Sequence, residues 1–482
     1  MATLKRNFFY SFFLTTSNYL MSLVVFPYVS RVLGPESLGL VSFVNGTVGC
    51  FTLLATMGIN SLGIREVARW RHNHTKLSEI YSSLLALSII STIIGVAGFI
   101  TTCILIPNLR EHRMLVAFGV PCIIFQVLVI EWFYKGIEDF RYITIRGVIV
   151  KTCYIVAVFL FIKNPNDYVI YFILITATFA INAIINLIHT RKFARFSFHT
   201  ISIRQWIRPF LYLGSYTILG ALYTTFNLLF LGIVTNDTQV GYYAVSVKVF
   251  TIILGTFTAL TSVLMPRMSA MLANKQEQEF IHHVKRTIST FTVLAIPLTI
   301  LGITYSPIIV TLIAGDAYAP AILPMQILMP LIFLIGYEQI LVVQILTPLN
   351  RDRLILRNSL LTAVLAIVLN FCIVKVLGAT GSAIIWTSCE LFLVILSQIY
   401  TSRLTGISFP WKEALSILTV CLPGITAIII INQITENIWL QAILGTIFFL
   451  SIYLSIQLFI TKNEACKQLV AALSKKQSGK NQ

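Results

Sequence analysis

Long uncharged runs recur along the whole chain, and short segments that carry most of the charges separate them. The hydrocarbon core of a bilayer is about 30 Å thick, and roughly 20 helical residues cross it. The pattern therefore predicts an all-α membrane protein with fourteen transmembrane helices. We expect them at residues 8–31, 37–63, 79–106, 112–134, 141–163, 167–190, 209–234, 238–265, 284–313, 319–347, 354–376, 379–402, 413–433 and 437–461.

The placement of basic residues tests this count and gives an orientation. If the N-terminus is cytoplasmic, 28 of the 35 Lys and Arg residues fall in the inner segments or the C-terminal tail. Five fall in outer loops, and Lys151 and Lys248 lie within helices. Cytoplasmic loops of membrane proteins carry an excess of Lys and Arg, and one miscounted helix would invert every later loop. We therefore predict that both termini are cytoplasmic.

Composition excludes a soluble protein. Hydrophobic residues make up 57% of the chain and charged residues 11%, with a mean hydropathy of +0.85, whereas soluble domains carry about 25% charged residues. The net charge of +17 then belongs to loops at an anionic leaflet rather than to a nucleic-acid surface. The eight cysteines are scattered singly, so we expect no disulfide, metal site or cofactor. The loop histidines lack an evident third ligand; they are His72, His74, His282 and His283.

A basic linker divides the chain into two similar halves. It runs over residues 189–208, reads HTRKFARFSFHTISIRQWIR, and contains five Arg or Lys and no acid. Gly39 precedes Arg65 by 26 residues, and Gly241 precedes Arg267 by the same distance. Six helices per half are an even number, so the second half has the same orientation as the first and forms a parallel repeat.

This repeat predicts four parts of the chain. They are an N-terminal lobe of six helices at 1–190, the interfacial linker at 191–208, a C-terminal lobe of six helices at 209–404, and a terminal helix pair with a polar cytoplasmic tail at 405–482.

Four stretches resemble the signatures of one known family. They are FPYVSRVLGPESLGLVSFV (26–44), GINSLGIREVAR (58–69), IEWFYKGIEDFRYITIR (130–146) and LGIVTNDTQVGYYAVSVK (231–248). Together they resemble Wzx-type polysaccharide flippases of the multidrug/oligosaccharidyl-lipid/polysaccharide exporter superfamily. The resemblance implies a non-enzymatic transporter of the bacterial inner membrane, with two lobes around a central polar cavity. It implies movement of undecaprenyl-diphosphate-linked oligosaccharide to the outer leaflet, for the synthesis of O-antigen, capsule or exopolysaccharide. Whether other polysaccharide assembly proteins are partners stays open.

Three basic residues are candidates for a cationic cavity, because a diphosphate and its sugars need polar partners to cross hydrocarbon. Lys248 lies deep in its predicted helix, where a cavity role competes with a structural ion pair. Lys151 lies only about 7 Å beyond Arg146 and is equally consistent with a side chain that reaches the inner interface. Arg31 follows an expected helix break at Phe26–Pro27, and its alternative role is contact with lipid phosphates at the membrane rim.

Two acidic residues also lie deep. Glu338 is thirteen residues from Arg351, and Glu390 is thirteen from Arg403, so each is roughly 20 Å from the inner face. A charged carboxylate there costs about 2.5–3.5 kcal/mol unless it is paired or protonated. Two interpretations stay open: coupling to H⁺ or Na⁺, or a structural role in a salt bridge with Lys248 or as a protonated carboxyl.

Three other functions compete with an oligosaccharide flippase. Drug exporters of the same superfamily resemble twelve-helix proteins, and the terminal helix pair argues against them. A lipid II flippase shares the fourteen-helix plan but matches the four stretches less well. A membrane polysaccharide polymerase or ligase would need a large outer loop with catalytic residues, and every predicted outer loop is short.

Overall fold

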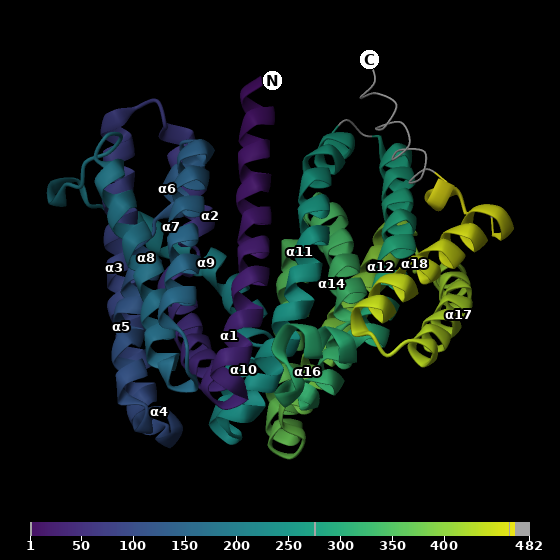
Figure 1. Ribbon diagram of the computed structural model, residues 1–482. Coiled ribbons are helices and arrows are strands. Elements are labelled where there is room, and N and C mark those ends of the chain that lie inside the picture. Colours follow the sequence, from purple (N-terminus) through teal and green to yellow (C-terminus); the bar gives the residue numbers. More distant parts are fainter. Residues whose placement is uncertain (1, 274–275, 462, 468–482) are drawn as a thin grey trace. The chain divides into compact units, whose positions relative to one another are not determined.

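The computed structural model describes residues 2–273, 276–461 and 463–467, and all regular elements in these ranges are helices (Figure 1). The polar tail expected from the sequence lies almost entirely outside them. Membrane-spanning segments must satisfy their backbone hydrogen bonds internally, so an all-helical chain is what the hydropathy pattern demands.

The first half of the chain contains eleven α-helices and two short 3₁₀ turns. They are α1 (Ala2–Thr56), α2 (Ile59–Trp70), α3 (His74–Leu105), α4 (Pro107–Glu111), α5 (Arg113–Leu128), α6 (Glu131–Gly136), α7 (Phe140–Phe161), η1 (Pro165–Asp167), α8 (Tyr168–Thr190), η2 (Phe198–Thr200), α9 (Arg204–Ala221), α10 (Thr225–Val234) and α11 (Asp237–Ala273).

The second half begins at α12 and includes three π-helical segments. Its elements are α12 (Glu277–Ala314), the 3₁₀ segment η3 (Asp316–Ala321), α13 (Ile322–Leu328), α14 (Leu331–Gln339), the π-helix η4 (Ile340–Leu346), α15 (Asp352–Leu369), the π-helix η5 (Asn370–Val374), α16 (Lys375–Thr405), α17 (Trp411–Ile434), α18 (Ile438–Ser455) and the π-helix η6 (Ile456–Ile460).

Ten helices in the described part of the chain are long and apolar enough to cross a membrane. The number rises to eleven if α9 and α10, which are bent by 51°, form one broken span. The protein is therefore an all-α, multi-pass membrane protein, as the sequence predicts.

Two of the long apolar stretches are broken by a glycine. Gly34 has φ of 74° within α1, and Gly378 has φ of 53° within α16, a region that glycine adopts without steric cost. Both fall between pairs of expected spans. The expected break at Phe26–Pro27 is wrong, because α1 stays helical through Pro27 and changes direction only at Gly34.

Two expected spans end earlier than hydropathy alone predicts. The span at 37–63 stops at Met57, where φ is 27°, and the span at 112–134 stops at Ile130, where φ is 43°. The residues beyond form α2 and α6, which pack closely together: a Cβ added at Gly63 would lie 2.6 Å from Cδ2 of Trp132. These short helices and α3 share one buried apolar cluster.

The chain divides into two compact units that do not coincide with its two sequence halves. The first comprises residues 1–245, 313–318 and 363–385. In it α1 packs against α3, α5 and α7, and α5 packs against α8 (Figure 1). The second comprises residues 246–312, 319–362 and 386–482.

The terminal pair α17 and α18 packs against α12 in the second unit. The apolar cluster there includes Val293 of α12, Cys421 of α17 and Phe449 of α18. The Tyr453 hydroxyl donates a 2.8 Å hydrogen bond to the Val293 carbonyl. A Cβ at Gly424 would lie 2.6 Å from Cδ2 of Phe449, so the two helices of the pair pack closely at this glycine.

Candidate functional site

Arg31 is exposed on α1, three residues before the Gly34 break. The segment of residues 313–318 packs beside it in the first unit. The Ser30 hydroxyl donates to the Ile313 carbonyl at 3.3 Å, and the buried Tyr318 hydroxyl donates to the Ser30 carbonyl at 3.2 Å. The Arg31 side chain also lies against this segment, because a Cβ added at Gly315 would stand 3.8 Å from Cγ of Arg31.

The two glycines that mark the sequence repeat lie against each other. A Cβ at Gly39 would stand 2.7 Å from the Gly241 nitrogen and closer still to the Asp237 carbonyl oxygen. A Cβ at Gly241 would stand 2.9 Å from the Pro35 carbonyl carbon. Small residues allow such close backbone approach between membrane helices. The helices α1 and α11 therefore cross at these glycines, directly after the break in α1.

The start of α11 also contacts the second break. The Ala379 backbone N–H, which follows Gly378, donates to the Gln239 side-chain oxygen at 2.9 Å. The Asn227 amide of α10 donates to the Ser382 carbonyl at 2.8 Å. The beginning of α11 thus contacts both broken helices within the first unit, α1 near Gly39 and α16 at Ala379.

Arg146 of α7 is a candidate that sequence analysis missed. Its guanidinium is 6% exposed and pairs with Glu131 of α6 at 3.1 Å. Two further donors, Nε and Nη1, are buried without a hydrogen-bond partner among the described residues. Hydropathy does not reveal that α6 packs beside α7, so the pairing of Arg146 with Glu131 could not be predicted from the sequence. Lys151 lies five residues farther along α7 and is half-buried.

A lateral groove of about 410 Å³ runs between α7 and α8 beside Arg146. Its apolar part carries isoleucines that are exposed on the outside of the protein, among them Ile145 and Ile149. Its polar end contains Asp139, Arg141 and His189. The His189 ring stacks on Tyr142 at 3.9 Å, and its Nε2 lies 4.0 Å from a carboxylate oxygen of Asp139. The groove therefore combines an apolar body with a polar end that contains both an acid and basic residues.

Lys248 lies on α11 in the second unit and is half-buried. Ser246 donates to the Ala321 carbonyl at 2.9 Å, and the Phe250 ring contacts Trp386 edge-on at 5.4 Å. At 100° per residue, Ser246 and Phe250 share one face of the helix and Lys248 lies on the opposite face. The helix therefore packs through one side and directs Lys248 away from it.

Glu338 of α14 and Glu390 of α16 come together in the second unit. Their carboxyls interact electrostatically, and Glu390 is only 4% exposed. They are 52 residues apart in sequence, so their proximity could not be predicted from spacing. Of the five residues singled out from the sequence, Glu338, Glu390 and Lys248 belong to the second unit, and Arg31 and Lys151 belong to the first.

An apolar groove of about 440 Å³ lies beside the terminal helix pair, also in the second unit. Side chains of α12, α14, α16 and α17 line it, together with Phe409 and Trp411. Its lining is apolar except for Thr299 and Thr387 and contains no charged residue, which suits a hydrocarbon chain better than a charged ligand.

Comparison with known proteins identifies the family. The model for polysaccharide biosynthesis proteins matches residues 4–272, which are more than half of the chain. The chain belongs to the polysaccharide biosynthesis protein family. This match confirms the resemblance drawn from the four sequence stretches.

Two relatives match this chain over nearly the whole of their own length. A protein of Escherichia coli (strain K12) named "Putative O-antigen transporter" is 21% identical over 401 residues, covering 83% of this chain and 96% of the relative. A protein of Shigella dysenteriae with the same name is 22% identical over 401 residues, covering 81% and 98%.

Solved transporters share the fold of this polysaccharide biosynthesis protein. The lipid II flippase MurJ in an inward closed conformation gives a TM-score of 0.74 at 13% identity, covering 93% of this chain and 98% of that one. An inward-facing MATE family multidrug transporter of the MOP superfamily gives 0.62 at 15% identity, covering 80% and 94%. The chain is a multi-pass membrane protein of this family, and its fold is similar to that of these solved transporters.

Proposed function

We propose that the protein moves polyprenyl-diphosphate-linked oligosaccharide units from the cytoplasmic to the outer leaflet for the synthesis of a surface polysaccharide. The observation that carries the proposal is the match to two O-antigen transporters over at least 96% of their length. Family membership over residues 4–272 supports it, as does a fold similar to a lipid flippase.

The proposal includes fourteen transmembrane helices with both termini in the cytoplasm. Division of α1 at Gly34 and of the stretch Asp352–Thr405 at Gly378 supports this number, together with the bent pair α9–α10 and the 37-residue α11. In this topology two six-helix lobes related by a parallel repeat alternate between inward-open and outward-open states, and the terminal pair stands outside the repeat.

The basic residues Arg31, Lys151 and Lys248 are proposed to face the cavity and bind the diphosphate. Arginine and lysine are the usual partners of phosphate oxygens, and charge-assisted hydrogen bonds are about twice as strong as neutral ones. The carboxyl pair Glu338–Glu390 is proposed to bind H⁺ or Na⁺, because an intramembrane acid pair is favourable only when a cation or proton is shared. Such binding would bias the two lobes between states.

The test is export in a bacterium that lacks its own oligosaccharide transporter but makes the lipid-linked repeat unit. The wild-type chain should restore surface polysaccharide, and the double variant Arg31→Ala/Lys248→Ala should lower it at least tenfold at equal membrane expression. The exposed Lys412 provides the control, and Lys412→Ala should export normally. Normal export by the double variant would refute the cationic cavity, and no export by the wild type with any matched repeat unit would refute the function.

A lipid II flippase is the second candidate, and the TM-score of 0.74 with MurJ is the observation that favours it. Proteoliposomes of the purified chain separate the two candidates. Reorientation of a polyprenyl-diphosphate oligosaccharide faster than lipid II supports the first proposal, and the opposite preference supports the second. Export of a cationic dye, with neither lipid moved, would support a drug exporter.

A further inference from the structure

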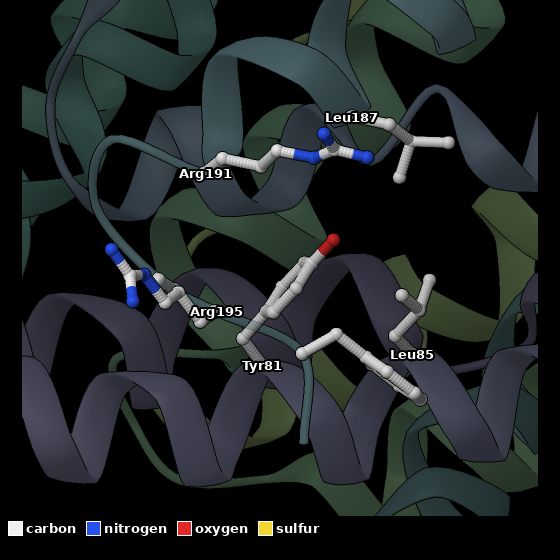
Figure 2. Close-up of a pocket in the computed structure, with 7 residues that line it drawn as sticks. Tyr81, Leu85, Leu187, Arg191 and Arg195 are labelled. Atoms are coloured by element: carbon white, nitrogen blue, oxygen red, sulfur yellow. The ribbon is translucent and has the colours of Figure 1, made fainter. Parts of the chain in front are cut away.

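A pocket of about 560 Å³ lies where the basic linker leaves α8 and folds back over α3 (Figure 2). Tyr81, Arg191 and Arg195 provide its polar lining. The remaining lining residues are apolar; they are Leu85, Leu187, Ala194 and Phe196. The pocket belongs entirely to the first unit and contains none of the residues proposed above for the transported substrate.

Serine hydroxyls of α3 position the linker at this pocket. The backbone N–H of Arg195 donates to the Ser78 hydroxyl at 3.2 Å, and that of Ser197 donates to the Ser82 hydroxyl at 3.0 Å. The N–H of Ser202 donates to the Ser83 hydroxyl at 3.0 Å. These bonds use backbone groups of the linker, so the arginine side chains take no part in holding it.

Tyr81 is fixed by packing while its hydroxyl faces the pocket. The side chain is 4% exposed, and its ring contacts Phe133 edge-on at 5.3 Å and Trp132 at 6.4 Å. Figure 2 shows the hydroxyl pointing toward the side of the pocket where Arg191 lies. The phenol is thereby a pre-oriented donor, with little conformational entropy left to lose on binding.

The two guanidinium groups have no carboxylate partner. Both arginines are exposed, and no salt bridge or side-chain hydrogen bond of Arg191 or Arg195 occurs in the part of the chain that the structure describes. In Figure 2 the Arg195 guanidinium points away from the Tyr81 hydroxyl, and this exposed side chain must turn to join Arg191 and Tyr81. Two planar guanidinium groups and a phenol can then together bind the oxygens of a phosphate group.

The surroundings place the pocket at a membrane surface. Just after the pocket, Phe198 is 79% exposed although the linker is rich in charge. Leu85 and Leu187, by contrast, line the pocket from within the long helices α3 and α8. Exposed aromatic residues beside basic ones are typical of the headgroup layer, where apolar rings enter the bilayer and cations meet phosphates.

We propose that this pocket binds the phosphate head group of an anionic phospholipid in the leaflet next to the linker, with the phosphate on Arg191, Arg195 and Tyr81. The glycerol and first chain carbons lie along Leu85 and Leu187. A volume of about 560 Å³ falls in the ordinary range for small-ligand sites, about 300–1,000 Å³. The linker connects α8 with α9, so the bound lipid fastens the connection between the two halves of the sequence.

Binding of short-chain phosphatidylglycerol to the delipidated, full-length protein in detergent tests the proposal. Each charge-assisted contact is worth about 1.5–3 kcal/mol, or at least about tenfold in affinity. The double variant Arg191→Ala/Arg195→Ala should therefore bind at least about tenfold more weakly. The neighbouring Lys192 is basic and exposed but does not line the pocket, so Lys192→Ala should bind as the wild type does.

Further variants and ligands keep the test decisive. Tyr81→Phe preserves the buried ring and should weaken binding several-fold at unchanged thermal stability, which provides a second measurement if the double variant folds poorly. Diacylglycerol, which lacks the phosphate, should not bind. Unchanged affinity in the double variant or in Tyr81→Phe would overturn the proposal. Displacement of the lipid by inorganic phosphate at equal concentration would show a free-anion site and overturn it too, as would tighter binding of polyprenyl diphosphate than of phosphatidylglycerol.

Discussion

Alanine at Gly39 should disrupt the crossing of α1 and α11. The added Cβ would stand 2.7 Å from the Gly241 nitrogen and nearer still to the Asp237 carbonyl oxygen, whereas carbon atoms in van der Waals contact are about 3.5–4.0 Å apart. Both neighbours are backbone atoms, so a side-chain rotation cannot relieve the overlap. The two helices must move apart by more than about 1 Å or lose their contact, because the carbonyl oxygen overlaps most. Overpacking of this kind costs about 1–3 kcal/mol.

Gly49 provides a matched control on the same helix. A Cβ there would stand 3.4 Å from Cγ2 of Thr225, which is an ordinary contact. Replacement of a helical glycine by alanine is by itself favourable by about 0.8–1 kcal/mol, and both variants share this gain. The difference between Gly39→Ala and Gly49→Ala therefore isolates the crossing, and we expect it to be about 2 kcal/mol or more.

The free energy of unfolding can be measured by SDS titration of the purified protein in mixed micelles. Gly39→Ala should unfold at lower SDS than the wild type, and Gly49→Ala at the same or higher SDS. Gly241→Ala should behave as Gly39→Ala does, because its Cβ would meet the Pro35 backbone. Equal stability of Gly39→Ala and Gly49→Ala would refute a close crossing at these glycines.

Three other predictions follow from side-chain contacts. Glu131→Ala should destabilise the protein by about 2 kcal/mol in the same SDS titration, because it leaves the buried Arg146 guanidinium without its carboxylate. Ser82→Ala should make trypsin cleave the linker faster, and Ser88→Ala should not, because the Ser88 hydroxyl bonds only within α3. Glu390→Gln should keep the fold and abolish the dependence of lipid transport on an imposed ion gradient in proteoliposomes.

Exposed acidic residues are the controls for the two glutamate variants. Glu79 pairs with Lys76 at 2.9 Å on an exposed face, so Glu79→Ala should cost less than about 1 kcal/mol. Glu436 is exposed between α17 and α18, so Glu436→Gln should retain gradient-driven transport. A stability loss at Glu79 equal to that at Glu131, or ion-dependent transport by Glu390→Gln, would contradict the corresponding contact or role.

The sequence predicts the helices because hydrocarbon thickness imposes a length on them, and most residues of each expected span are helical. Local backbone breaks are harder to predict, because they depend on which contacts compensate them. Proline suggested a break at Pro27, yet the helix continues there and breaks at Gly34. At Ile130 a β-branched residue adopts φ of 43°, and the conformational preferences of isoleucine do not predict this.

The sequence could not predict which distant residues of the site lie close together in the fold. Gly39 and Gly241 were found as markers of a repeat, but only the fold shows that they touch each other. Glu338 and Glu390 were both judged deep, but their pairing depends on how α14 packs against α16. Tyr81 had no distinguishing pattern at all, since its role depends on a linker more than 100 residues later in the chain.

The hydrogen bonds between α3 and the linker have a consequence for how this protein tolerates change. The route of the linker is specified by hydroxyls on Ser78, Ser82 and Ser83, which accept from main-chain groups that every residue except proline possesses. The exposed side chains along the linker, such as Lys192 and Phe198, can therefore be exchanged without altering its course, whereas the buried Ala194 also holds it by packing. A proline at position 195, 197 or 202 would redirect the linker. The path of the linker is therefore determined largely by α3, which precedes it by more than a hundred residues.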